Sequence, residues 1–149
     1  MCYNYLRKGE MVMNNRKKVL VVEDDTWLRY SIEDKLEEWG YTVTEAVSGN
    51  DAHTILIHGE GKKNPFDAVV SDMRMPRGSG LWLCQALDGE DPAKVPPVLM
   101  HSSDMEYRGD GMHLMDLGEL KKSFKFVKEV HLKPVNGDWS YIKIFLETL

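Results

Sequence analysis

Acidic side chains stand directly after two short apolar runs of this sequence and could support metal binding and phosphoryl transfer. Glu23, Asp24 and Asp25 follow the first run, and Asp72 follows a later one. Carboxylates that lie close together repel one another unless a cation sits among them, and an oxygen-only ligand set selects a hard ion such as Mg²⁺. An aspartate can also attack phosphorus to give an aspartyl-phosphate. These residues predict that chemistry if the fold brings them together.

Two further groups are suited to hold a phosphoryl group. Ser102 follows the apolar run of residues 98–100, and Lys133 follows the run of residues 130–132. A transferred phosphoryl group spreads its charge over three oxygens, so its transfer depends mostly on positioning and charge neutralisation. An ammonium can pair with one of these oxygens, and a hydroxyl can donate a hydrogen bond to another.

Alternating strand and helix patterns predict the scaffold that must position these groups. Short apolar or alternating runs indicate strands at residues 19–22, 41–47, 66–71, 98–100 and 130–132. The intervening segments are interpreted as helices at residues 27–39, 50–57, 81–87, 117–127 and 139–149, with a polar loop at residues 59–64. Five alternations predict an α/β fold with a doubly wound parallel sheet. The carboxyl ends of its strands share one edge, where the polar groups should meet.

Composition and charge narrow the class of protein. The chain has 149 residues, of which 42% are hydrophobic and 29% charged, as expected for one soluble globular domain. Residues 1–17 show no periodicity and are interpreted as a flexible N-terminal extension, so that residues 18–149 form the domain. A net charge of −5 argues against direct nucleic-acid binding.

Cysteine usage and hydropathy indicate the compartment. The two cysteines, Cys2 and Cys84, stand far apart, which excludes a disulfide framework and fits a reducing cytoplasm. Apolar runs stay well short of the roughly 20 residues of a membrane span, so we expect no membrane association. We also expect none of the five histidines to be a metal ligand or a phosphate donor, namely His53, His58, His101, His113 and His131.

Five motifs in order resemble the receiver domain of response regulators in two-component systems, from about residue 18 to residue 149. They are Val21-Val22-Glu23-Asp24-Asp25, Ser71-Asp72-Met73-Arg74-Met75-Pro76, Gly80, Val98-Leu99-Met100-His101-Ser102-Ser103 and Lys133-Pro134. The resemblance implies a flavodoxin-like, five-stranded sheet with strand order 2-1-3-4-5. It also implies a regulatory phosphoacceptor rather than an enzyme, one that assists only its own phosphorylation and dephosphorylation. A histidine kinase or phosphotransfer protein would supply the phosphoryl group, and a downstream protein target would read it.

The resemblance further implies a role for each site residue. Asp72 would be the phosphoacceptor and a ligand of Mg²⁺. Asp24 would bind the ion directly, Glu23 through water, and Arg74 through its main-chain carbonyl. Asp25 occupies a variable position, and we expect it to cap the following helix instead of binding metal.

Two residues of the later motifs complete the implied site. Ser102 would be the switch hydroxyl, and Lys133 would bind the phosphoryl group. By the same resemblance we expect a cis peptide bond between Lys133 and Pro134. Arg74 and Asp104, each two residues beyond a site residue, either form an ion pair across the mouth of the site or are solvated separately.

The sequence also departs from the resemblance. The segment between Ser102 and Lys133 is longer than usual and includes Gly109, Gly111 and Gly118. Val130 stands three residues before Lys133, where many receivers carry Tyr or Phe. We expect output through the helix of this segment, the fifth strand and the last helix, with transmission from Ser102 that differs in detail from the aromatic switch.

Three alternatives compete with this interpretation, and residues of the sequence argue against the second and the third. The chain could be a receiver module cut from a DNA-binding response regulator or from a hybrid histidine kinase. A phosphohydrolase with an aspartyl nucleophile would usually carry an acid two residues after it, where this chain has Arg74. A flavin-binding module of the same strand order would need a loop rich in Ser, Thr and Gly after the first strand, where this chain has three acids.

Overall fold

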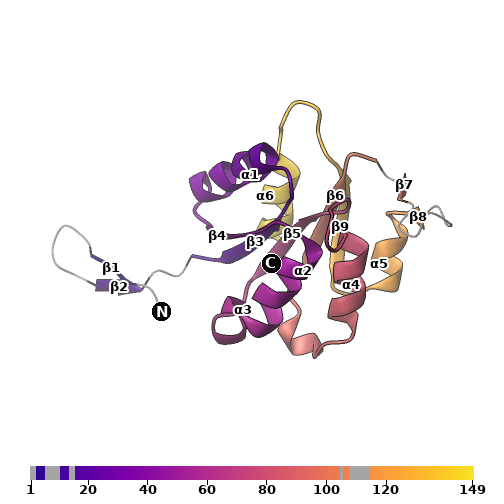
Figure 1. Cartoon of the computed structure of the whole chain (residues 1–149). Coiled ribbons are helices and arrows are strands. Elements are labelled where there is room, and N and C mark those ends of the chain that lie inside the picture. The colour runs from indigo at the N-terminus through magenta and orange to yellow at the C-terminus, as the bar shows by residue number, and fades with distance from the viewer. Residues whose placement is uncertain (1–2, 6–10, 14–15, 105, 108–114) are drawn as a thin grey trace.

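A five-stranded parallel sheet forms the centre of the molecule in the computed structural model, which describes residues 3–5, 11–13, 16–104, 106–107 and 115–149 (Figure 1). The strands run in the spatial order β4-β3-β5-β6-β9. Their bounds are β3 Lys18–Val22, β4 Thr42–Ala46, β5 Ala68–Asp72, β6 Val98–Ser102 and β9 Val127–Leu132. Numbered along the chain, this order is 2-1-3-4-5, which confirms the predicted fold.

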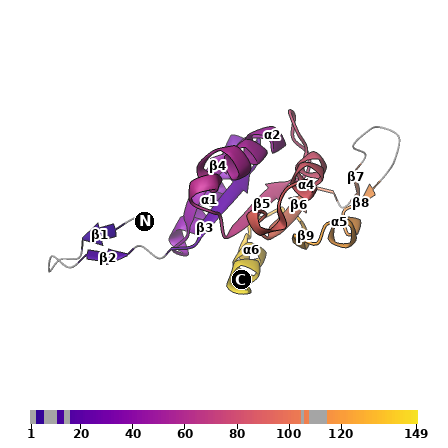
Figure 2. The same ribbon diagram turned by 90° about the horizontal axis from the view of Figure 1, so that it is seen from below.

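Helices cover both faces of the sheet because alternate strand residues face opposite sides. Leu20 and Val22 pack in a core with α2 (Gly49–His53), α4 (Gly80–Asp88) and α5 (Glu119–Ser123). Val19 and Val21 pack in the other core with α1 (Thr26–Glu38) and α6 (Ser140–Glu147). Figures 1 and 2 show β4 towards one edge of the sheet and α5 beside β9 at the other. The three inner strands are therefore buried on both sides.

Helix α1 begins immediately after the acidic residues that follow β3. The Asp25 carboxylate accepts a hydrogen bond from the backbone N–H of Leu28 at 3.0 Å, so Asp25 caps the helix as predicted. Gly40, with φ of +92°, follows the helix in the left-handed conformation that glycine adopts most readily. The cap fixes the direction of the chain directly after Asp24.

Several element assignments differ from the sequence-based ones. The segment Thr54–His58 is a π-helix that continues α2, and α3 (Glu60–Lys63) lies within the predicted polar loop. Glu60 forms an ion pair with buried Lys18 at 2.6 Å, which orders the start of α3. Val127 belongs to β9 and not to the preceding helix. Its apolar spacing with Leu117, Leu120 and Phe124 arises because the loop, helix and strand all face one core.

Short antiparallel pairs and a 3₁₀ turn complete the described elements. Strand β1 (Tyr3–Tyr5) pairs with β2 (Met11–Met13), and β7 (Glu106–Tyr107) pairs with β8 (Met115–Asp116). The 3₁₀ turn η2 spans Pro92–Lys94. Gly109 and Gly111 lie outside the described residues, and the flexibility of residues 1–17 stays a prediction. Within the described ranges, the helices are all too short or too polar to cross a membrane.

Candidate functional site

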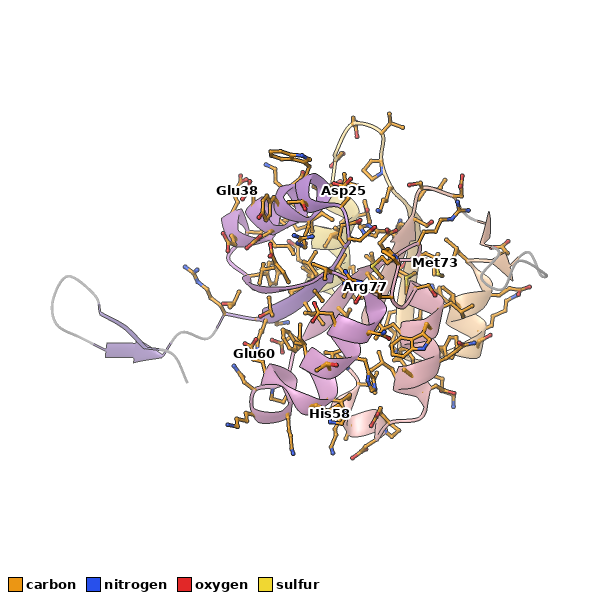
Figure 3. All side chains as sticks on the ribbon, in the orientation of Figure 1. Asp25, Glu38, His58, Glu60, Met73 and Arg77 are labelled. Atoms are coloured by element: carbon orange, nitrogen blue, oxygen red, sulfur yellow. The ribbon has the colours of Figure 1, made fainter. Side chains whose placement is uncertain are left out.

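Three carboxylates meet at the carboxyl ends of β3 and β5. Val22 lies opposite Ser71 in the sheet, so the residues that follow the two strands are neighbours. Glu23, Asp24 and Asp72 each offer an oxygen atom, and these three atoms all lie within 4.8 Å of one another. Asp24 is exposed, whereas Glu23 and Asp72 are only 1% and 5% exposed. Figure 3 labels Asp25, which follows Asp24, and Met73, which follows Asp72. Both lie on the side of the molecule away from Glu60.

The ammonium of Lys133 bridges the two buried acids. Its Nζ atom lies 2.7 Å from Oε2 of Glu23 and 3.2 Å from Oδ1 of Asp72. The backbone N–H of Lys133 donates to the carbonyl of Ser102 at 2.8 Å, which extends the pairing between β6 and β9 by one residue. Lys133 thus enters the site directly from the end of an edge strand.

The peptide bond between Lys133 and Pro134 is trans, so the predicted cis bond is wrong. The expectation assumed that the chain must turn sharply to aim the lysine at Asp72. The structure shows instead that Lys133 keeps the strand direction through its hydrogen bond to Ser102. Its long side chain is sufficient to reach Glu23 and Asp72.

The site holds more negative charge than its one bridging ammonium can balance. Burial, and next the charge of Asp72, raise the pKa of Glu23 to about 7 although Lys133 opposes this. Burial also raises the pKa of Asp72, again against the effect of Lys133. For Lys133 burial acts to lower the pKa, but Asp72 and Glu23 outweigh it and raise the pKa above its ordinary value. A second cation would relieve the remaining repulsion.

The donor set suits Mg²⁺ by its chemistry. Glu23, Asp24 and Asp72 supply only oxygen atoms, and Mg²⁺ uses one or two carboxylates while it keeps several waters. The backbone N–H of Met73 donates to Oδ1 of Asp72 at 2.8 Å and holds that carboxylate in place. The three acids could hold the ion. That the main-chain carbonyl of Arg74 is a further ligand stays a prediction.

Ser102 and the pair Arg74–Asp104 lie beside these acids. Ser102 ends β6, which stands between β5 and β9 in the sheet, and its side chain is buried. Its Oγ accepts a hydrogen bond from the backbone N–H of Asp104 at 3.4 Å. Nη2 of Arg74 lies 3.2 Å from Oδ2 of Asp104, so these two side chains form an ion pair and are not solvated separately.

Arg29 and Gly80 support the site without taking part in its chemistry, and only Gly80 could be identified from the sequence. The buried guanidinium of Arg29 donates through Nη1 to the Glu23 carbonyl at 2.9 Å, and an arginine inside an amphipathic helix gives no hint of this contact. Gly80 was part of the sequence motif, and the structure shows why. A Cβ atom there would lie 2.7 Å from the Asp72 carbonyl oxygen, closer than packing allows. The backbone N–H of Gly80 also donates to the Met73 carbonyl at 2.8 Å.

Comparison with known proteins shows a family and a fold to which the chain is similar. Residues 19–131 match the family described as "Response regulator receiver domain". Chemotaxis protein CheY-3 of Vibrio cholerae serotype O1 is 32% identical over 96 residues, which are 64% of this chain and 70% of that protein. The probable transcriptional regulator ycf27 of Cyanophora paradoxa is 34% identical over 101 residues, which are 67% of this chain and 39% of that protein. The solved structure of chemotaxis response regulator CheY4 of Vibrio cholerae matches with a TM-score of 0.65 at 24% identity, covering 91% of this chain and all of that one.

Proposed function

The chain belongs to the response regulator receiver domain family of two-component systems, and from this premise we propose that it is a phosphoacceptor switch. Asp72 accepts a phosphoryl group from a histidine kinase or a phosphotransfer protein, and Mg²⁺ assists. The observation that supports this assignment most directly is the meeting of Asp72 with Glu23, Asp24 and the Lys133 ammonium at one sheet edge.

In the proposed transfer, one carboxylate oxygen of Asp72 bonds to phosphorus while the bond from phosphorus to the donor's imidazole nitrogen breaks. The electron pair of the broken bond returns to the imidazole. The backbone N–H of Met73 and the Lys133 ammonium orient the Asp72 carboxylate before the reaction. Asp24 and Asp72, with Glu23 acting through water, would hold Mg²⁺, and the ion would supply positive charge beside the phosphoryl oxygens.

After transfer, Lys133 and Ser102 become partners of the new phosphoryl group. The ammonium already lies 3.2 Å from Asp72, so it can pair with a phosphoryl oxygen with little movement. The buried Ser102 hydroxyl, at the end of the neighbouring strand, can donate to another oxygen. This second contact would draw the end of β6 towards Asp72 and make the phosphorylated state structurally distinct.

The proposed switch acts through protein contacts: a histidine kinase or phosphotransfer protein on the input side and a downstream protein target on the output side. We propose no direct nucleic-acid contact for this chain. The alternative that this chain is a receiver module from a longer DNA-binding regulator remains, because the match to the ycf27 transcriptional regulator covers only 39% of that protein. The cytoplasmic location inferred from the isolated cysteines stays a prediction.

Phosphorylation of purified protein tests the proposal. Incubation with Mg²⁺ and acetyl phosphate should add one acid-labile phosphoryl group, detected by mass spectrometry of the intact chain. Asp72→Asn should abolish the addition and keep the far-ultraviolet circular dichroism of the wild type. Asp34→Asn, which changes an exposed acid on α1, should be modified like the wild type. Normal modification of Asp72→Asn would contradict the assignment of the acceptor.

A further inference from the structure

A buried histidine lies directly beside the proposed phosphoacceptor. His101 has no exposed surface, and in the sheet its Cα atom faces that of Asp72 on one side and that of His131 on the other. Its carbonyl accepts a hydrogen bond from the backbone N–H of Met73 at 3.2 Å, and Ser102 is the next residue. A movement at the end of β6 must therefore move His101 as well.

The imidazole of His101 has one hydrogen-bond partner among the residues that the structure describes. Its Nδ1 atom lies 2.7 Å from the hydroxyl of Tyr141, while its Nε2 atom is buried without a partner. Burial, followed by the charges of Lys133 and His131, lowers the pKa of His101 to about 3, so the ring is neutral. This hydrogen bond is partly buried, and on the His101 side, which has no exposed surface, breaking it would leave the imidazole without a partner.

Tyr141 joins two strands of the site to helix α6. It stands in the first turn of α6, where its hydroxyl contacts His101 of β6. Its ring lies against that of His131 in β9, with centroids 4.7 Å apart at an interplanar angle of 31°. His131 is two residues before Lys133. One side chain of α6 thus contacts both strands that carry the phosphoryl-binding groups Ser102 and Lys133.

This arrangement accounts for the missing aromatic residue in β9. Val130 packs against the core on the side of α4 and α5, and an aliphatic side chain cannot form a polar link to β6. The next residue, His131, faces the other side of the sheet and meets Tyr141 there. In the described part of the chain, the rings of Tyr141 in α6 and of Trp139 just before it lie beside His101 of β6, so aromatic contact with this strand comes from the last helix region and not from position 130.

We propose that Tyr141 is a positioning residue that couples the phosphorylation of Asp72 to the packing of α6 on the sheet, through its contacts with His101 and His131. When Ser102 moves towards the phosphoryl group, His101 moves with it and away from Tyr141, so the hydrogen bond between the two side chains is lost. The inference rests on the proposed phosphorylation of Asp72.

Coupling of this kind is reciprocal. The hydrogen bond between His101 and Tyr141 belongs to the unphosphorylated arrangement, so its loss should favour the phosphorylated one. Tyr141→Phe removes only the hydroxyl and keeps the ring against His131. This variant should be phosphorylated by acetyl phosphate at least twofold faster than wild type, whereas a merely destabilised domain would react more slowly. Tyr30→Phe, on the exposed side of α1, should react at the wild-type rate.

Amide NMR of the full chain tests the link directly, with Mg²⁺ and beryllofluoride as the phosphoryl mimic. In the wild type, resonances of residues 72–74 and 102–104 should shift together with those of residues 140–147. In Tyr141→Phe the shifts at residues 140–147 should fall by at least half, while the shifts around Asp72 remain.

The outcomes separate the two proposals. If the wild-type site responds but α6 does not, or if Tyr141→Phe matches the wild type in both shifts and rate, the coupling role of Tyr141 is wrong. If the resonances around Asp72 themselves do not respond in the wild type, the proposed phosphoacceptor function fails, and the inference falls with it.

Discussion

Arg74 and Asp104 form an ion pair from two neighbouring loops at the carboxyl edge of the sheet, with Nη2 of Arg74 3.2 Å from Oδ2 of Asp104. Each stands two residues beyond a site residue, Asp72 and Ser102 respectively. The side chains are 53% and 61% exposed, and exposed pairs contribute only about 0–1 kcal/mol to stability. The pair therefore contributes little to folding, and we expect any effect it has to lie in access to the site.

Loss of this ion pair should shorten the lifetime of the phosphorylated state. Hydrolysis requires a water molecule that approaches phosphorus in line with the Asp72 oxygen, and we expect the pair to shield that approach. Arg74→Ala and Asp104→Ala should each speed dephosphorylation by about threefold, equivalent to roughly 0.6 kcal/mol of barrier. The double variant should decay no faster than the quicker single variant. Time courses of phosphoryl loss measure this, and fully independent effects would count against shielding by the pair.

Asp24 and Asp25 should respond oppositely to alanine substitution although they are adjacent. Asp24→Ala removes a proposed ligand, so we expect Mg²⁺ affinity to fall about tenfold or more, or roughly 1.4 kcal/mol. Its apo form should be at least as stable as wild type, because repulsion on Asp72 falls. Asp25→Ala should keep Mg²⁺ affinity but lose about 1 kcal/mol of stability with the helix cap.

Two measurements on the same samples separate these effects. The fluorescence of Trp27, which is 82% exposed in the first turn of α1, should report Mg²⁺ binding. Denaturant unfolding without metal gives the stability. Equal Mg²⁺ affinities in the Asp24→Ala and Asp25→Ala proteins would exclude the proposed ligand set.

Lys133→Met should strengthen Mg²⁺ binding while it weakens the phosphorylated state. The ammonium competes with a metal ion for Glu23 and Asp72, because it contacts both carboxylates. Its removal should tighten Mg²⁺ binding by about threefold or more, or roughly 0.6 kcal/mol, and should lower the yield of phosphorylated protein at equilibrium. Lys128→Met, an exposed change on the same strand, is the matched control. Weaker Mg²⁺ binding by Lys133→Met would show that the ammonium does not compete with the ion.

Glu33 should make the apo protein less stable as the pH rises towards neutrality. Its hydrogen bond with Glu45, followed by burial, raises the pKa of Glu33 from 4.5 to about 7. Between these values the folded state binds more protons than the unfolded state, so the free energy of unfolding falls as pH rises through this window. Glu33→Gln should make this dependence shallower, whereas Glu119→Gln on α5 should not.

Denaturant unfolding at a series of pH values from 4 to 8 would be the measurement. Part of the slope should persist in Glu33→Gln because the pKa of Glu23 is also raised to about 7. A pH dependence identical to that of wild type would mean that Glu33 carries no shifted proton in the folded protein.

The placement of the acids could be predicted from sequence because it follows from topology alone. Residues that end neighbouring parallel strands must share an edge, so Glu23, Asp72 and Ser102 required no knowledge of side-chain packing. The trans bond after Lys133 could not be anticipated in this way. An X-Pro bond can adopt either isomer at small cost, so the sequence Lys133-Pro134 does not fix which one the fold selects.

The contact between His101 and Tyr141 shows what sequence patterns leave out. Periodicity assigns each residue to a helix or a strand. It does not determine how α6 is rotated about its own axis over the sheet. That rotation decides whether Tyr141 meets His101 or solvent. A histidine within an apolar strand gave no indication of its partner, and the π-helical turn of Thr54–His58 was equally hidden in an ordinary helical pattern.

The salt bridge between Glu23 and Lys133 joins residues 110 positions apart, one from an inner strand and the other from the edge strand that the chain makes last. During synthesis on the ribosome, the acids of β3 and β5 emerge well before β9, so a nascent chain has the carboxylates without the ammonium. The ammonium can reach these carboxylates only after β9 has joined the sheet, so the salt bridge closes at the last step in the assembly of the domain.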